Sequence, residues 1–315
     1  SRGLGDVYTR PSPTQLKRDI VDKWIDAAVA AGYKRNPDYN GADQEGVSYF
    51  QLTLDKGRRC SSAVAYLKPA RDRKNLTVIT HAQAEKLLIK DGRTTGVTVN
   101  IKGASLDIMA RREIILSAGT IGSPQILMLS GVGAADELKQ QGITVVHNLP
   151  GVGKNLQDHL QARPVFKTDL STINIETNNL LKQSMIALQY ALTQTGPMTM
   201  AASLGTAFLK TDPTLDTPDI QFHIQPFSAS APADGPHKFS AFTASVLQMR
   251  PESPGHISLK SPNWRDHPAI HPNYVATKRD QETIVKGIQI ARKIAQFEPL
   301  KAHITGEFTP GSGVA

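Results

Sequence analysis

The sequence predicts a mixed fold, in which an α/β portion is followed by an α+β portion with helices flanking an antiparallel sheet. Two patterns carry this prediction. In residues 111–133 an apolar run, a turn of small residues and a short helical segment follow one another, as in the strand–turn–helix unit of an α/β protein. After residue 160, alternating strand patterns and long helical patterns are grouped apart, which is typical of an antiparallel sheet backed by helices.

The first expected element is a helix over residues 13–31, which ends at Gly32. The segment 36–41 follows it and contains Asn, Pro, Asp and Gly, which predicts a turn. One face of the helix carries apolar side chains at helical spacing, namely Ile20, Trp24, Ala27, Ala28 and Ala31.

Short strands dominate the next hundred residues. Asp91-Gly92 lies between two of them and predicts a hairpin turn. The expected strands cover residues 76–80, 84–89, 96–100, 106–116 and 144–146.

Residues 117–133, together with the apolar run that precedes them, form the most informative stretch of the chain. Arg111–Leu116 contains β-branched apolar residues, as expected of a buried parallel strand. Ser117-Ala118-Gly119 follow, where the backbone can lie against a flat ligand. Ser123 is the expected N-cap, Pro124 the first helical residue, and Gly131 the stop. A strand, a small-residue turn and a helix N-terminus together form an arrangement that holds an anionic cofactor.

The sequence after residue 160 predicts two long helices and three strands. The helices cover residues 178–195 and 280–297. The strands alternate apolar and polar residues and cover 219–224, 240–249 and 255–260.

The composition is that of an ordinary globular chain and argues against two classes of protein. Of the 315 residues, 39% are apolar and 20% are charged, and no apolar run approaches the ~18–20 residues of a membrane span. The net charge of +8 comes from basic residues scattered along the chain, without interleaved aromatic residues or zinc-finger spacing. We therefore expect neither a membrane span nor a nucleic-acid partner.

Reactive and metal-binding residues are sparse. Cys60 is the single cysteine, so no internal disulfide forms, and we expect it to be a packed helix residue. His267 and His271 are close in sequence but lack a third ligand, so a structural role is expected and no metal site is predicted. The serines offer no G-x-S-x-G elbow for nucleophilic catalysis. His303 lies in a helix-like stretch, where we expect a surface histidine rather than a base.

Residues 119–133 resemble, position by position, the second signature of the glucose-methanol-choline (GMC) flavoprotein oxidoreductases. Gly119, Ser123-Pro124, Ser130-Gly131 and Gly133 have the family's spacing. The resemblance covers nearly the whole chain, and bacterial choline-dehydrogenase-like members look closest. Further stretches similar to the family are 57–67, 75–82 and 149–160.

Two elements that the resemblance implies are not recognised in this sequence. The family's Rossmann motif, G-x-G-x-x-G, cradles the FAD pyrophosphate. Gly3-Leu4-Gly5 and Gly151-Val152-Gly153 lack its third glycine and are expected to be turns. The family's catalytic His lies in a stretch resembling Y-H-P-x-G-T, and this chain stops at 309–315, about where that stretch is expected to begin. The chain thus resembles the middle of a larger enzyme, with no catalytic residue of its own.

The resemblance also implies which residues contact the cofactor. Ala84 stands where the family meets the adenine through its backbone, and the adenosine is expected along Ser117, Ala118 and Gly119. Asn155, Asp158 and His159 belong to a loop near the cofactor, although a hydrogen bond that orders this loop is an equal alternative for Asp158 and His159. His223 is a candidate for lining the substrate cavity, the alternative being an ordinary sheet residue.

The predicted domains are a substrate-domain segment over 1–54, a partial FAD-binding lobe over 55–159 and a substrate-binding domain over 160–315. The expected parent enzyme oxidises an alcohol to an aldehyde and passes hydride to flavin N5, and this chain alone is expected to lack FAD and activity. The alternative is a non-catalytic ligand-binding domain derived from the same fold. Leu204 stands where choline-dehydrogenase-like members carry Glu, which favours an uncharged alcohol over choline. A bacterial, cytoplasmic protein is expected, while the alcohol, the electron acceptor and the oligomeric state are left open.

Overall fold

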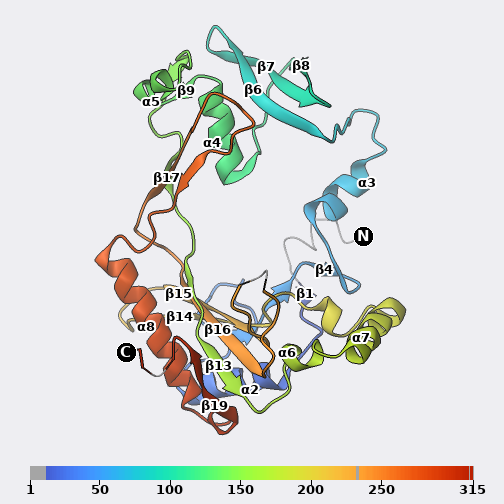
Figure 1. Ribbon diagram of the computed structural model, residues 1–315, viewed down its shortest axis with the longest axis vertical. Helices are drawn as coiled ribbons and strands as arrows, with labels where there is room; N and C mark the ends of the chain where they lie inside the picture. Colours follow the sequence, from blue (N-terminus) through green and yellow to red (C-terminus); the bar gives the residue numbers. More distant parts are fainter. Residues whose placement is uncertain (1–11, 232–233, 312, 315) are drawn as a thin grey trace. The chain divides into compact units, whose positions relative to one another are not determined.

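A computed structural model describes residues 12–231, 234–311 and 313–314 (Figure 1). The expected turn at Gly3-Leu4-Gly5 lies outside the described residues. The chain divides into two compact units. Unit 1 comprises residues 1–73, 159–250 and 278–315, and unit 2 comprises 74–158 and 251–277. The expected domains over 1–54, 55–159 and 160–315 stay a prediction.

Unit 1 is built on an antiparallel sheet with the strand order β19-β13-β16-β15-β14-β2 and with β12 also paired to β16 (Figure 1). Cross-strand partners such as Phe222 and Val246 fix the register between its two central strands, β15 and β16. The strands are β2 (Gly46–Tyr49), β12 (Gln161–Ala162), β13 (Val165–Thr168), β14 (Gly205–Leu209), β15 (Ile220–Gln225), β16 (Ala241–Gln248) and β19 (Ile304–Thr309).

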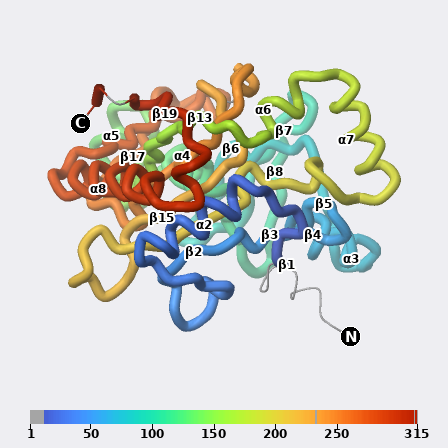
Figure 2. The backbone as a smooth tube through the Cα atoms, turned by 90° about the horizontal axis from the view of Figure 1, so that it is seen from below, coloured from blue at the N-terminus to red at the C-terminus, as the bar shows by residue number. Residues whose placement is uncertain are grey.

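Two helices, α2 (Asp19–Ala30) and α8 (Lys278–Ala295), pack on each other and on this sheet (Figure 2). Every second residue of β15 is fully buried in the resulting core, because successive side chains of a strand point to opposite faces. Trp24 of α2 packs against Phe222 of β15, with 5.8 Å between their ring centroids. Apolar burial between these two helices and the sheet is therefore the main source of stability in unit 1.

Smaller elements complete unit 1. Gly57 lies between β4 and β5, and its backbone is so close to Gln194 that an added Cβ would be 2.0 Å from the Gln194 carbonyl oxygen. The elements are β1 (Ser12–Pro13), β3 (Gln51–Leu52), β4 (Leu54–Asp55), β5 (Arg58–Arg59), η1 (Ala63–Leu67), α3 (Lys68–Ala70), α6 (Ile173–Glu176), α7 (Leu180–Thr193), η2 (Pro197–Thr199) and η3 (Lys301–His303).

Unit 2 contains two three-stranded antiparallel sheets, β6-β7-β8 and β11-β17-β18. Two further strands, β9 and β10, pair in parallel. A small core forms around Met128, Leu138 and Ile257. The elements are β6 (Ala82–Lys90), β7 (Arg93–Ile101), β8 (Ala104–Met109), α4 (Gly119–Leu129), β9 (Val132–Gly133), α5 (Ala135–Gln140), β10 (His147–Asn148), β11 (Lys154–Leu156), β17 (Gly255–Ser258) and β18 (Ala269–His271).

The hairpin and the long helices expected from the sequence are confirmed. Asp91 and Gly92 have φ values of 50° and 74°, which fit the turn between β6 and β7. Gly32 and Gly131 also have positive φ and follow the ends of α2 and α4, as predicted. The structure combines helices with antiparallel sheets, so the α+β part of the expected fold class is observed.

Several predicted strands are wrong. Residues 76–80 and 111–116 form no strand, and neither do residues 144–146. A buried parallel strand needs neighbours to pair with, and no described strand pairs with these segments. Without such a partner the apolar run is exposed, as the 79% exposure of Ile115 shows.

Three further expectations need correction. The first helix begins at Asp19 rather than at residue 13, because Ser12 and Pro13 pair with β3 instead. The strand expected over 255–260 does not extend the sheet of unit 1: β17 pairs with β11 and β18 in unit 2. Helix α4 begins at Gly119, four residues before the expected N-cap at Ser123, so that Pro124 lies inside the helix.

Candidate functional site

The turn that leads into α4 presents small residues at an exposed helix N-terminus. Ser117, Ala118 and Gly119 are exposed, and the Ser123 hydroxyl accepts a hydrogen bond from the Ala118 N–H at 3.1 Å. Gly119 has a φ of 79°, and an added Cβ would meet no atom within 4 Å. The glycine is thus explained by its backbone conformation, and open space lies beside it where a flat ligand could approach.

Ala84 lies on β6, the strand of its sheet that packs against α4. The Ser130 hydroxyl, just after α4, accepts a hydrogen bond from the Leu87 N–H of β6 at 2.8 Å. The structure therefore places the strand of Ala84 and the helix that follows Ser117–Gly119 side by side in unit 2. Their contact with a cofactor stays a prediction.

The three residues predicted to belong to a loop near the cofactor are divided between the two units. Asn155 is exposed in β11 and has a φ of 56°. Asp158, also in unit 2, accepts a hydrogen bond from the Tyr274 hydroxyl, and this bond raises the pKa of Tyr274. His159 belongs to unit 1, where its Nε2 atom is 2.9 Å from the Met249 carbonyl oxygen. Asp158 and His159 thus each make a contact within the protein. Such a contact, which orders the loop, was the alternative to a contact with the cofactor.

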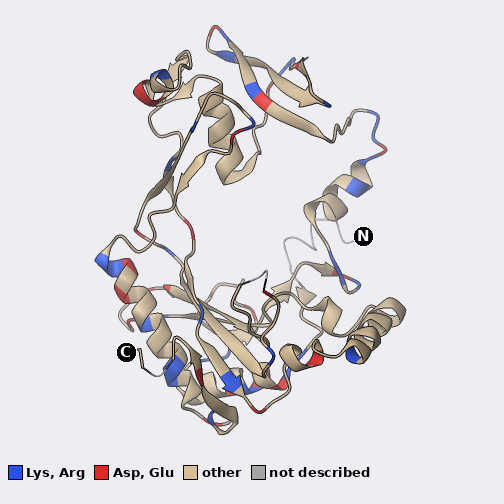
Figure 3. Ribbon diagram, viewed as in Figure 1, with Lys and Arg blue, Asp and Glu red and all other residues tan. Residues whose placement is uncertain are grey.

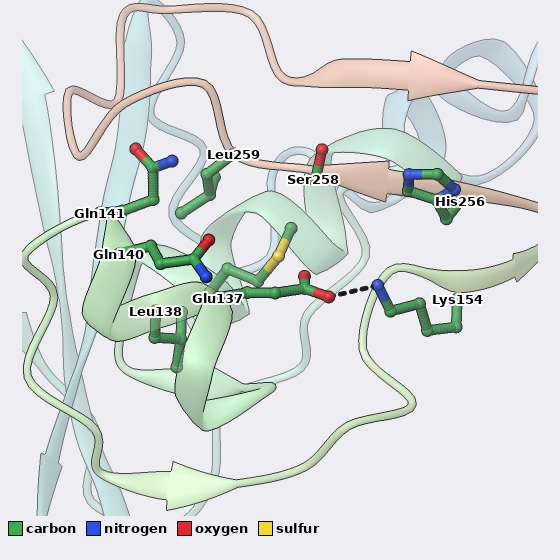
Figure 4. A pocket seen from close by; sticks show the side chains of 9 residues that line it. Glu137, Leu138, Gln140, Gln141, Lys154, His256, Ser258 and Leu259 are labelled. Atoms are coloured by element: carbon green, nitrogen blue, oxygen red, sulfur yellow. Dashed lines mark hydrogen bonds and ion pairs between the residues drawn. The ribbon is translucent and has the colours of Figure 1, made fainter.

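Unit 2 also contains a cavity of about 310 Å³ between α4, α5, β11 and β17 (Figure 4). Lys154 and Glu137 are among the residues that line it, and they form an ion pair at 2.5 Å. Both side chains are about two-fifths exposed, so this pair contributes little to stability. None of the predicted cofactor residues lines the cavity, and its acid and base neutralise each other.

His223 occupies the middle of the sheet in unit 1. Its cross-strand neighbours are Thr206 on β14 and Ser245 on β16, so the three side chains share a face. The ring of Phe50 packs edge-on against the imidazole, with 5.2 Å between the centroids. The Ser245 hydroxyl is buried and has no hydrogen-bond partner among the described residues. This face, which we call the polar face, is opposite to the one that packs on α2 and α8.

Sequence reasoning identified His223 but missed the other residues of the polar face. Thr206, Thr243 and Ser245 alternate with apolar residues on β14 and β16, and this period of two was the available signal. Thr206 was missed because β14 was not recognised as a strand. Thr243 and Ser245 lie on a predicted strand, but its pairing beside His223 is not visible in the sequence.

The imidazole of His223 is expected to stay neutral at neutral pH. Burial, and secondarily the charge of His159, lowers the pKa of His223 below its usual value of 6.5. The unfolded chain therefore takes up this proton first, and the stability contributed by neutral His223 is complete above about pH 6.5 and is lost progressively as the pH falls below it. In an NMR titration His223 should titrate below 6.5, and His159→Gln should raise its pKa only part of the way. A value at or above 6.5 in the unsubstituted protein would contradict this assignment.

The remaining candidates have structural contacts. Cys60 is buried, although it lies before η1 and not within a helix. His303 is the last residue of the short helical turn η3, and its Nδ1 atom is 2.9 Å from an Asp169 carboxylate oxygen. His271 stacks on His256, with 4.4 Å between the rings. Within the described ranges, no three His, Cys, Asp or Glu side chains are grouped to hold a metal ion.

Two family models, both described as GMC oxidoreductase, match the chain over residues 10–161 and 251–313. The chain belongs to the GMC oxidoreductase family. It is 37% identical over 301 residues to an alcohol dehydrogenase [acceptor] of Pseudomonas putida, covering 94% of this chain and 54% of that protein. It is 38% identical over 313 residues to the mitochondrial choline dehydrogenase of Mus musculus, covering 98% of this chain and 52% of that protein.

Solved structures agree with this assignment. The pyridoxine 4-oxidase of Mesorbium loti matches with a TM-score of 0.82 and 25% identity, covering 97% of this chain and 56% of the other. A formate oxidase matches with the same TM-score at 23% identity, covering 93% of this chain and 56% of the other, and shows the shared fold. The chain thus spans about half the length of the relatives it matches. Among its described helices, none has the length and apolar character needed to cross a membrane.

Proposed function

We propose that this chain is the central part of an FAD-dependent enzyme that oxidises an uncharged primary alcohol to an aldehyde. The polar face carries this proposal: a neutral histidine and a buried, unpartnered serine hydroxyl lie side by side on a sheet of the GMC fold. A buried hydroxyl without a partner among the described residues is costly, and a hydrogen bond from Ser245 to a bound alcohol would require its neighbours to move aside, because its oxygen is closed to solvent. A cytoplasmic location stays a prediction.

The residues of unit 2 fit one part of the cofactor. Open space at Gly119 and the small side chains of Ser117 and Ala118 suit the adenosine portion, with Ala84 on the neighbouring strand. Asn155, Asp158 and His159 are proposed as further contacts. The pyrophosphate needs a cradle of backbone N–H groups, and residues 12–231, 234–311 and 313–314 contain no G-x-G-x-x-G turn.

In this proposal the polar face binds and orients the alcohol. Bound FAD supplies the redox chemistry by accepting the hydride. Neutral His223, which is partly exposed, can donate a hydrogen bond to the substrate hydroxyl or accept one from it. Neither residue is proposed as the base, which the family resemblance places in a stretch that follows this one.

The identity of residue 204 supports an uncharged substrate. Leu204 is fully buried in the core of unit 1. A carboxylate at this position would be buried among apolar groups, which is costly unless it is paired. We therefore propose that the substrate lacks the positive charge of choline.

The test uses the longer protein that contains this chain, purified with its flavin. A primary alcohol should bleach the flavin under anaerobic conditions, and choline should do so far less. His223→Gln should raise KM about three- to tenfold and leave kcat nearly unchanged, as expected for one lost binding hydrogen bond. His256→Gln in unit 2 is the matched control and should change neither constant. Equal reduction by choline would refute the substrate class.

If the chain is instead a ligand-binding domain that has lost catalysis, a different result follows. The longer protein would then bind the alcohol without any flavin reduction, and His223→Gln would weaken that binding alone.

A further inference from the structure

Helix α7 of unit 1 presents an apolar stripe to solvent. Leu181, Met185, Leu188 and Leu192 are spaced by four, three and four residues, which places them on one side of a helix. Their side chains are between 59% and 76% exposed. Soluble helices normally turn such a stripe toward a core, so this one is unpartnered within the described residues.

The opposite side of α7 holds the helix in place. Ile186 and Tyr190, half-buried, lie on that side, and the Tyr190 hydroxyl is 3.5 Å from the Gly57 carbonyl oxygen. At the N-terminus the Asn179 side chain accepts hydrogen bonds from the N–H groups of Leu181 and Lys182, at 2.9 and 3.3 Å. The helix is therefore capped and anchored through its other face, which leaves the stripe directed outward.

Both basic and acidic residues lie on the elements around α7 (Figure 3), and the basic ones are in excess in the segment 55–73. The helix carries Lys182 and no acidic residue. The segment 55–73, whose β4–β5 turn contacts the helix, contains six Lys or Arg and two Asp. Lys56, Arg59 and Lys182 are exposed and form no ion pair with any described carboxylate. The apolar stripe is complementary to an apolar layer, and the exposed cations beside it are complementary to anionic groups at the edge of that layer.

We propose that α7 docks on the surface of an anionic phospholipid membrane. The stripe would enter the boundary between headgroups and acyl chains, while the neighbouring cations contact lipid phosphates. A second copy of the chain is the less favourable occupant, because symmetric pairing of α7 would bring the same cations together. At 14 residues α7 is too short to span a bilayer, so the helix lies in the interface plane.

The experiment is co-sedimentation of phospholipid vesicles with the longer protein that contains this chain. Vesicles of phosphatidylcholine and phosphatidylglycerol in a two-to-one ratio should retain the protein, and vesicles of phosphatidylcholine alone should retain much less. Leu188→Gln with Leu192→Gln should lower the partition constant about tenfold or more, since two buried leucines are lost and Gln keeps the helix propensity. Lys56→Gln, Arg59→Gln and Lys182→Gln together should lower it about tenfold or more on the anionic vesicles.

The matched control is Val29→Gln with Val285→Gln, which replaces two exposed apolar residues on α2 and α8 and should leave binding unchanged. Circular dichroism checks that every variant is folded. As a second measurement, Met185→Trp should show fluorescence quenching by brominated lipids in the anionic vesicles. Equal binding by the α7 and control variants, an unquenched tryptophan, or self-association through α7 without vesicle binding would overturn the proposal.

Discussion

The 315-residue chain on its own should be colourless and should show no alcohol-dependent reduction of an artificial acceptor, even with added FAD. Two separate elements are not recognised in it: the phosphate cradle and the general base. Without the base, turnover falls by about 10² to 10⁴. Without the cradle the hydride acceptor is not held in place, which forfeits orientation effects worth about 7–11 kcal/mol.

Dye reduction with a primary alcohol measures this directly, and flavin absorbance of the purified chain measures cofactor binding. The longer protein, assayed in parallel, is the positive control. A yellow chain that turns over alcohol would mean that the active site lies within these residues.

Phe222→Ala should destabilise unit 1 by about 3–5 kcal/mol. Phe222 is fully buried at the centre of the sheet and packs against Trp24, so its removal leaves a cavity between β15 and α2. Since whole domains are stable by only about 5–15 kcal/mol, this one substitution should bring unit 1 close to unfolding.

Urea denaturation followed by Trp24 fluorescence checks this effect. The other tryptophan, Trp264, lies in unit 2, so the measurement is made with Trp264→Phe in the background. Phe308→Ala is the control, because Phe308 is 42% exposed and its loss should cost far less. If both substitutions cost the same, the core does not lie where the structure places it.

Local signals were enough to predict some elements of this fold. The β6–β7 hairpin follows from Asp91-Gly92 between two alternating runs, and α8 follows from its apolar period. Both depend on residues near in sequence. Residues 111–116 show the limit of such signals. An apolar run forms a buried strand only if neighbouring strands are present to pair with it, and the local sequence does not show whether they are.

Long-range pairing explains the other errors. The alternation in β17 predicts a strand correctly but does not indicate which sheet it joins, and in fact it returns to unit 2. Likewise the apolar period of α7 predicts a helix, and only the tertiary structure shows that its stripe is exposed. Thr206 and Ser245 could join His223 as candidates only after the register of β14, β15 and β16 was known.

The most direct test of the central claim, that this chain is the middle of an FAD-dependent alcohol oxidoreductase, is the flavin content of proteins that restore its flanking sequence in steps. Adding the upstream segment should give a yellow protein without turnover, because the cradle returns but the base does not. Adding the downstream segment alone should give neither colour nor activity, and adding both should give near-stoichiometric flavin together with alcohol oxidation. A protein with both flanks that remains colourless would contradict the account.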